Sequence, residues 1–391
     1  MSQPAPLVHS TASTPTALTS SFKEVVLPQI LGIHPYVPGK PISELQRELG
    51  LTRITKLASN ENPLGASPKV LEAIHQALVD IARYPDGSAY ELKTELAHFL
   101  KCQTNQLVIG NGSNELLELV ARAFAGPGDE IVYSQYAFAV YPISAQVVGA
   151  TGVEVTAKNW GHDLDAMANA ITAKTKVVYL ANPNNPTGTL FNRQAWEAFI
   201  SRVPAHVIVV LDEAYVEYAQ AAVNAQDYLN GMAYINAHPN VLVSRTFSKA
   251  YGLASLRVGY MAGTPEIIGY LNQLRAPFNI NQLAQVAAVA ALKDAEFVQK
   301  GVALNQQGMQ QIITALNELN IESIASVANF LCINLGEKAA KINQMLLQKG
   351  VIVRPVANYG LTQFLRVSIG THAENAHFIE ALRASLQEQQ A

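Results

Sequence analysis

Short apolar runs alternate with segments of helical periodicity between about residue 107 and residue 262, and this alternation constrains the fold most. Several runs are apolar throughout, such as Val207–Leu211, which is typical of strands buried on both faces of a parallel sheet. The pattern predicts an α/β domain with a mostly parallel seven-stranded sheet between helices. The seven predicted strands are Leu107–Gly110, Glu130–Ser134, Gly152–Thr156, Val177–Ala181, Val207–Leu211, Val241–Arg245 and Val258–Ala262.

The pattern changes after residue 281, where a long Ala- and Gln-rich helical stretch begins. Helices then dominate, with β-rich runs near residues 330–335, 351–354 and 364–369. A chain of 391 residues is long enough for two domains. We therefore expect a large domain over residues 55–281 and a smaller α+β domain built from residues 31–54 and 282–391. Residues 1–30, which begin with a Ser-, Thr- and Pro-rich stretch, are expected to form a flexible arm.

Charged residues make up only 15 % of the chain, and the net charge is −3. This balance argues against a nucleic-acid partner, and the low charge suggests extensive buried surface. No apolar run reaches the ~18 residues of a membrane span, and the first residues lack the basic start of a targeting signal. The two cysteines, Cys102 and Cys332, form no metal-ligand pattern, so we expect a cytoplasmic protein with free thiols and no membrane association.

Lys249 follows a predicted strand and precedes a run of small residues that leads to Arg257. Small residues allow the backbone to approach a ligand closely, and Thr246, Ser248 and Arg257 could together hold a phosphate. A lysine in a dry site flanked by cations has a lowered pKa and can form a Schiff base. A lone loop lysine is more often a solvated surface residue, so this interpretation depends on the neighbours.

Asp212 stands at the carboxyl end of the apolar run Val207–Leu211, where α/β sheets bind ligands. Such a carboxylate can keep the ring nitrogen of a pyridoxal cofactor protonated, although an acidic residue here can also simply cap the next helix. The stretch Asn182–Gly188 can hold the Asn185 amide against a ligand, or be a proline-stiffened loop. The turn Gly110–Glu115 can bind phosphate through backbone N–H groups, or be an ordinary helix cap.

These four stretches occur in the order and spacing of the fold-type I pyridoxal phosphate aminotransferases, which the chain resembles. Three further stretches, Leu57–Pro63, Arg83–Asp86 and Val353–Thr371, are similar to those of the histidinol-phosphate aminotransferases. The resemblance extends from about His34 to the C-terminal helix. It implies an enzyme that uses pyridoxal 5′-phosphate in transamination.

The resemblance also implies how the cofactor ring would be bound. Lys249 would bind the cofactor covalently, and its freed amine would act as the general base. Asp212 would pair with the ring nitrogen. Asn185 and Tyr215 would form hydrogen bonds with the ring 3′-oxygen. Phe138 would stack on the ring, although many relatives carry tyrosine there.

The cofactor phosphate would be bound by a turn backbone and a group of side chains. By resemblance these are Gly112, Ser113, Asn114, Thr246, Ser248 and Arg257. Asn114 replaces an acidic residue that is common in relatives, so only its backbone role carries over. Tyr84 would reach the same phosphate from a second subunit, which implies a homodimer with a shared site.

The substrate would be bound mainly by arginines. Arg366 would clamp the α-carboxylate, while Arg354, Tyr36 and Asn60 would face the distal end of the substrate. The implied reaction interconverts histidinol phosphate and 2-oxoglutarate with imidazole-acetol phosphate and glutamate. Two alternatives stay open: an aromatic amino-acid aminotransferase and a phosphoamino-acid decarboxylase on the same scaffold. The sequence also leaves open which arginine takes the substrate phosphate.

Overall fold

A computed structural model describes residues 22–35, 39–224 and 226–389. Its main feature is a seven-stranded sheet in the order β2-β8-β7-β6-β5-β3-β4, in which only β8 runs antiparallel to its neighbours. The strands are β2 (Leu107–Gly110), β3 (Glu130–Ser134), β4 (Thr151–Val155), β5 (Thr175–Ala181), β6 (Ile208–Asp212), β7 (Val241–Thr246) and β8 (Gly259–Ala262). The predicted fold class is confirmed, with strand ends shifted by one or two residues.

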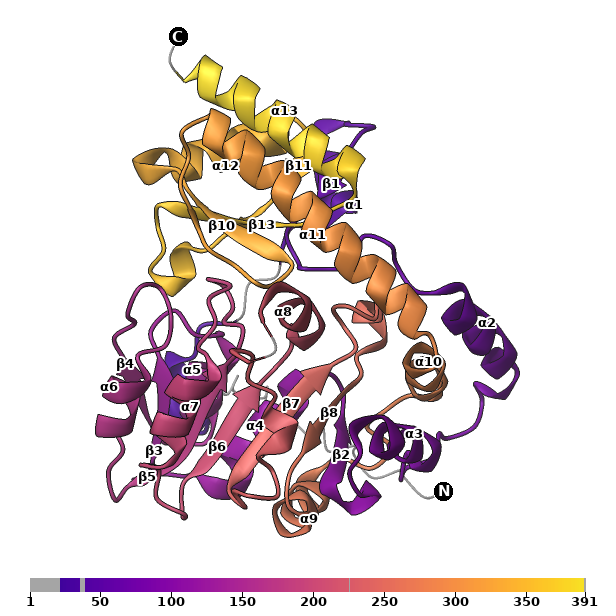
Figure 1. Ribbon diagram of the computed structural model, residues 1–391, viewed down its shortest axis with the longest axis vertical. Helices are drawn as coiled ribbons and strands as arrows, with labels where there is room; N and C mark the ends of the chain where they lie inside the picture. The colour runs from indigo at the N-terminus through magenta and orange to yellow at the C-terminus, as the bar shows by residue number, and fades with distance from the viewer. Residues whose placement is uncertain (1–21, 36–38, 225, 390–391) are drawn as a thin grey trace, which may run out of the picture.

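Helices cover both faces of this sheet (Figure 1). They are α2 (Pro68–Ala77), α3 (Tyr90–Leu100), α4 (Ser113–Phe124), α5 (Val140–Val147), α6 (Leu164–Asn169), α7 (Arg193–Ile200), α8 (Val216–Ala222), α9 (Pro265–Leu274) and α10 (Gln282–Leu292). The apolar positions of the central strands alternate between two separate cores, one on each face of the sheet. In β6, for example, Val209 and Leu211 face one core, while Ile208 and Val210 face the other. This two-sided burial explains why the central strands are apolar throughout.

A smaller part of the molecule lies above the sheet in Figure 1. It contains an antiparallel sheet in the order β12-β13-β10-β9 and a parallel pair, β1-β11. The strands are β1 (Thr55–Lys56), β9 (Ser323–Ile324), β10 (Phe330–Asn334), β11 (Val351–Ile352), β12 (Arg354–Pro355) and β13 (Phe364–Ser368). The helices are α1 (Ile42–Leu49), α11 (Ala295–Glu318), α12 (Ala339–Gln348) and α13 (His372–Glu388).

The long helix α11 runs from the large sheet to the smaller part (Figure 1). The preceding helix, α10, packs against α2 and α3, and its alanines belong to the core of the large sheet. The core of the large sheet therefore includes residues beyond 282, although the sequence pattern changes at that point. The division into domains stays a prediction, but α10 lies with the large sheet because its small side chains permit close helix packing.

Most of the predicted N-terminal arm lies outside the described residues. Its described end forms two short 3₁₀ helices, at Phe22–Glu24 and Pro28–Gly32, and the second lies against α5. Within the described part of the chain, no helix combines the length and the apolar character that crossing a bilayer requires.

Candidate active site

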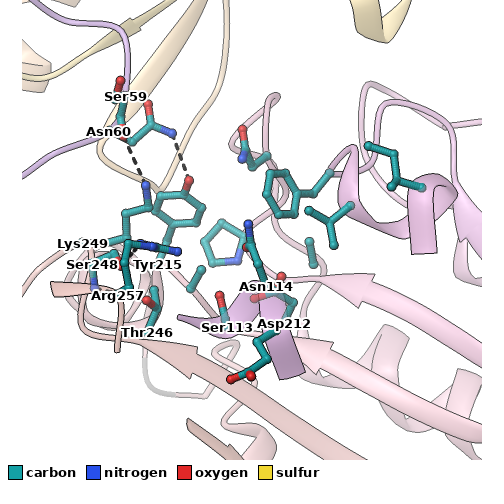
Figure 2. Close-up of a pocket in the computed structure, with 18 of the residues that line it drawn as sticks. Ser59, Asn60, Ser113, Asn114, Asp212, Tyr215, Thr246, Ser248, Lys249 and Arg257 are labelled. Atoms are coloured by element: carbon teal, nitrogen blue, oxygen red, sulfur yellow. Dashed lines mark hydrogen bonds between the residues drawn. The ribbon is translucent and has the colours of Figure 1, made fainter. Parts of the chain in front are cut away.

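A cavity of about 470 Å³ opens where the carboxyl ends of β5, β6 and β7 meet the smaller sheet. This edge is where α/β sheets bind ligands. Figure 2 shows Lys249, Tyr215, Asp212 and Ser248 gathered there. The predicted residues that line it are Asn60, Ser113, Asn114, Phe138, Asn185, Asp212, Tyr215, Thr246, Ser248, Lys249, Arg257, Arg354 and Arg366.

Lys249 projects its amine into this cavity from the turn that follows β7. The Nζ atom donates a hydrogen bond of 3.2 Å to the carbonyl oxygen of Ser59 (Figure 2). Burial, with help from the Arg366 and Arg257 cations, lowers the pKa of Lys249 to about 7. A large fraction of this amine is therefore neutral near pH 7, as a nucleophile or base requires.

Asp212 is a fully buried carboxylate at the end of β6. Its Oδ2 atom accepts a hydrogen bond of 2.9 Å from the hydroxyl of Tyr141, whereas its Oδ1 atom has no partner among the described residues. Burial raises the pKa of Asp212 to about 6, and the Tyr141 hydrogen bond opposes that rise. The unpaired oxygen is thus suited to accept a hydrogen bond from a protonated ring nitrogen.

A polar cradle is formed at the N-terminus of α4. Gly112 precedes the helix with φ of 76°, and a Cβ atom added there would lie 2.4 Å from Nη2 of Arg257. The Arg257 Nη1 atom donates to the Ser248 hydroxyl over 3.1 Å. Backbone N–H groups at Ser113 and Asn114, a guanidinium and a hydroxyl therefore converge, which is chemistry that suits a phosphate.

Two arginines line the opposite wall. Arg354 and Arg366 are direct partners across the antiparallel β12–β13 pair, and both are buried. Arg366 donates one hydrogen bond to Asn185 Oδ1 and another, of 2.9 Å, to the Ala58 carbonyl. Its Nε atom is buried and has no hydrogen-bond partner in the described part of the chain. Residues opposite each other on one face of a sheet are close, so these two positive charges favour an anion between or beside them.

Tyr215 lies beside Lys249, with the Nζ atom 5.7 Å from its ring centre. Its hydroxyl accepts a hydrogen bond of 2.9 Å from the Asn60 amide (Figure 2). Burial raises the pKa of Tyr215 to about 12, so its phenol is protonated at neutral pH.

Among the described residues, two predicted site residues, Gly112 and Tyr84, do not line this cavity. Tyr84 is 84 % exposed and stacks on Phe278 with ring centres 4.8 Å apart. The predicted role of Tyr84 in the site of a second subunit stays a prediction. Tyr36 lies outside the described residues.

The sequence reasoning missed two partners of the central residues. Tyr141 supports Asp212 from the first turns of α5, and the Ser59 carbonyl accepts the Lys249 hydrogen bond. No short sequence pattern predicts either contact, because each joins residues far apart in the chain. Tyr141 also packs edge-on against Phe138, which precedes α5, with ring centres 6.0 Å apart.

A family model described as aminotransferase class I and II matches residues 52–382, most of the chain. The chain belongs to the class I and II aminotransferase family. This aminotransferase is 62 % identical over 368 residues to histidinol-phosphate aminotransferase 2 of Hydrogenovibrio crunogenus, covering 94 % of this chain and 98 % of that one. It is 54 % identical to the protein of the same name from Pseudomonas fluorescens, over 94 % and 99 % of the two chains.

A solved structure supports the same assignment. The histidinol-phosphate aminotransferase of Sinorhizobium meliloti, in complex with pyridoxal-5′-phosphate, has a TM-score of 0.84 with this aminotransferase at 29 % identity. The alignment covers 93 % of this chain and 98 % of that chain. The predicted family is therefore confirmed by sequence and by structure.

Proposed function

We propose that this aminotransferase interconverts histidinol phosphate and 2-oxoglutarate with imidazole-acetol phosphate and glutamate, as in histidine biosynthesis. The observation that carries this is the pair Arg354 and Arg366, which are buried, face each other across two strands and line the cavity that holds Lys249. One cationic wall can accept a phosphate from one substrate and a carboxylate from the other, because the guanidinium fork matches both groups. The names of the relatives support this choice of substrate.

The residues present fit pyridoxal 5′-phosphate as the cofactor. Asp212 Oδ1 is a buried acceptor with no partner in the described chain, as a protonated ring nitrogen requires. The cradle of Gly112, Ser248 and Arg257 suits the phosphate, and Lys249 is the adjacent amine. When bound, this cofactor supplies a carbonyl for the substrate amine and a ring that accepts electrons.

The chain's own residues would divide the remaining tasks. The Lys249 Nζ atom would take the proton from the substrate Cα and deliver it to the C4′ carbon of the cofactor, since its pKa of about 7 suits both transfers. The Asp212 carboxylate holds a proton on the ring nitrogen by its negative charge. Asn185 and Tyr215 bind the ring oxygen, Phe138 covers the ring, and Arg366 orients the substrate carboxylate. Arg354, with Asn60, completes the distal pocket.

A homodimer with a shared site belongs to the same proposal. The largely exposed Tyr84 stacks on the half-exposed Phe278, and Val79 and Ile81, which are near Tyr84 in the chain, are also exposed. Exposed apolar groups of this kind favour association, and a second copy of this chain would cover them. A cytoplasmic location is supported by the free thiols of Cys102 and Cys332.

Steady-state rates with two amino donors test the substrate assignment. With 2-oxoglutarate as acceptor, kcat/KM for histidinol phosphate should exceed that for phenylalanine by about 100-fold or more, because a phosphate dianion interacts more strongly with the two arginine cations than a single carboxylate does. A preference for phenylalanine would instead identify an aromatic aminotransferase, and release of CO₂ from a phosphoamino acid would identify a decarboxylase. Borohydride reduction should attach the cofactor to the peptide that contains Lys249. An unmodified peptide would overturn the proposed role of Lys249.

A further inference from the structure

A chain of hydrogen bonds runs from Ser368 through Asn60 to Tyr215. The backbone N–H of Asn60 donates to the Ser368 Oγ atom over 2.8 Å, and the Ser368 hydroxyl donates to Asn60 Oδ1 over 3.0 Å. The Asn60 Nδ2 atom then donates to the Tyr215 hydroxyl over 2.9 Å (Figure 2). All three residues are buried. The Asn60 carbonyl is held in turn by the Asn329 amide at 3.0 Å.

The donors and acceptors in these hydrogen bonds follow from the first bond, between the Asn60 N–H and Ser368. A backbone N–H can only donate, so the Ser368 oxygen is an acceptor in the first bond. The Ser368 proton then needs its own acceptor, and within the described residues the only one it meets is Asn60 Oδ1. If the amide were reversed, this buried hydroxyl proton would have no acceptor among the described residues, which is unfavourable for a buried polar group. The nitrogen of the amide must therefore face Tyr215.

The orientation of the amide determines what Tyr215 can do. Because its oxygen already accepts from Asn60, its single proton is free to point toward the cavity that the ring lines. We propose that Ser368 and Asn60 are positioning residues that make Tyr215 a hydrogen-bond donor toward the cofactor's ring oxygen. The inference rests on the proposed function, in which Tyr215 contacts that oxygen.

The three residues come from distant parts of the fold. Ser368 ends β13 of the small sheet, Asn60 follows β1, and Tyr215 follows β6 of the large sheet. The donor role of Tyr215 therefore depends on how the smaller part sits over the large sheet. Within the described residues, the titratable or charged groups that interact with Tyr215 include Arg366, Asp212, Tyr359, Tyr141, Tyr218 and Lys249.

The pH dependence of the bound cofactor's visible absorbance tests the proposal in the holoenzyme. A donor at the ring oxygen stabilises its negatively charged form, so removing the donor raises the apparent pKa of the chromophore. Tyr215→Phe should raise it by about one unit, the effect of one charge-assisted hydrogen bond. Ser368→Ala should also raise the apparent pKa of the chromophore. Ser368→Thr, which keeps the hydroxyl, should restore the wild-type value.

A double variant separates this role from a structural one. If Ser368 acts through Tyr215, Ser368→Ala adds no further shift in the Tyr215→Phe background. Ser385→Ala, which removes another buried hydroxyl in α13, is the matched control and should leave the chromophore pKa unchanged.

The outcomes separate the contact of Tyr215 with the cofactor from the positioning role of Ser368. If Tyr215→Phe causes no shift, the proposed contact of Tyr215 with the cofactor is wrong. If Tyr215→Phe shifts the pKa but Ser368→Ala does not, or shifts it equally in both backgrounds, the positioning role is wrong while the proposed function stands. Should Ser368→Ala fail to fold, Ser368→Cys, a weaker donor of similar size, must give an intermediate shift.

Discussion

At the scale of single residues, burial controls the protonation of the groups at the centre of the cavity. It lowers the pKa of Lys249 to about 7 and raises that of Asp212 to about 6. The two pKa values lie close together, so near pH 7 to 8 the carboxylate is mostly ionised and the amine substantially neutral. A base and an electrostatic partner are thus available at the same pH.

The lowered pKa of Lys249 predicts how the cofactor-free protein should bind pyridoxal phosphate. The neutral amine is the reactive form, so the rate of covalent binding should rise with pH and be half-maximal near pH 7. Stopped-flow absorbance between pH 6 and 9 measures this. Arg366→Gln removes a cation that lowers the pKa, so its midpoint should move upward. A wild-type midpoint near the ordinary lysine value of about 10.4 would contradict the prediction.

Tyr141→Phe should weaken the reaction through Asp212. Loss of the hydroxyl removes a bond that stabilises the charged carboxylate, so the pKa of Asp212 should rise above its value of about 6. The acid limb of the kcat–pH profile should move to higher pH. At pH 7, kcat should fall about tenfold, which is the effect of one lost hydrogen bond, and KM should change little.

The matched control for that variant is Tyr179→Phe. Tyr179 stacks on Tyr141 with ring centres 4.8 Å apart, but its hydroxyl bonds to the Leu117 carbonyl instead of to Asp212. It should lower stability without moving the pH profile. Equal shifts in both variants would show that Tyr141 acts only through packing.

At the scale of elements, the β2–α4 turn joins backbone conformation to ligand binding. Gly112 combines a positive φ with a contact that leaves no room for a side chain, because Arg257 lies against it. The turn thereby directs the first N–H groups of α4 and the Arg257 guanidinium toward the same place.

Gly112→Ala should weaken cofactor binding by at least about tenfold and lower the free energy of unfolding by roughly 1–3 kcal/mol. A Cβ atom there would displace Arg257, and φ of 76° is unfavourable for alanine. Spectroscopic titration with the cofactor and urea unfolding measure the two effects. Gly126→Ala, after the other end of α4, meets no atom within 4 Å and should change neither quantity much. Unchanged affinity in Gly112→Ala would contradict the proposed cradle.

At the scale of the whole molecule, the exposed aromatic pair Tyr84 and Phe278 lies outside the cavity that its own chain forms. If a second copy covers this surface, each site contains residues of two chains. If sites are shared in this way, two variants with defects in different parts of the site can restore activity when their subunits are mixed.

Mixing Lys249→Ala with Tyr84→Phe should restore activity at limiting cofactor. A hybrid dimer would contain one site with both defects and one with neither, since Tyr84 and Lys249 of one site come from different chains. Activity after mixing and re-equilibration measures this. Lys249→Ala mixed with Arg257→Ala is the control and should stay inactive, because both residues serve the site of their own chain. Equal recovery in both mixtures, or none in either, would contradict the shared site.

The sequence by itself was sufficient for features that depend on short segments. Strand and helix periodicity indicated the α/β fold, and the position of Asp212 after Val207–Leu211 placed a carboxylate at the binding edge of the sheet. The reason is physical: side-chain alternation, turn residues and strand ends are set by neighbours within a few positions. The resemblance of its motifs then identified the family that the comparisons confirm.

Only the tertiary structure decided which distant residues meet. The pairing register of β12 with β13 sets Arg354 opposite Arg366, and a slip of one residue would have turned Arg366 to the other face. Likewise, the contacts of Tyr141 with Asp212 and of Asn60 with Tyr215 join residues 71 and 155 positions apart. No short-range pattern encodes such contacts, because they depend on how whole elements pack and on the direction of each buried hydrogen bond.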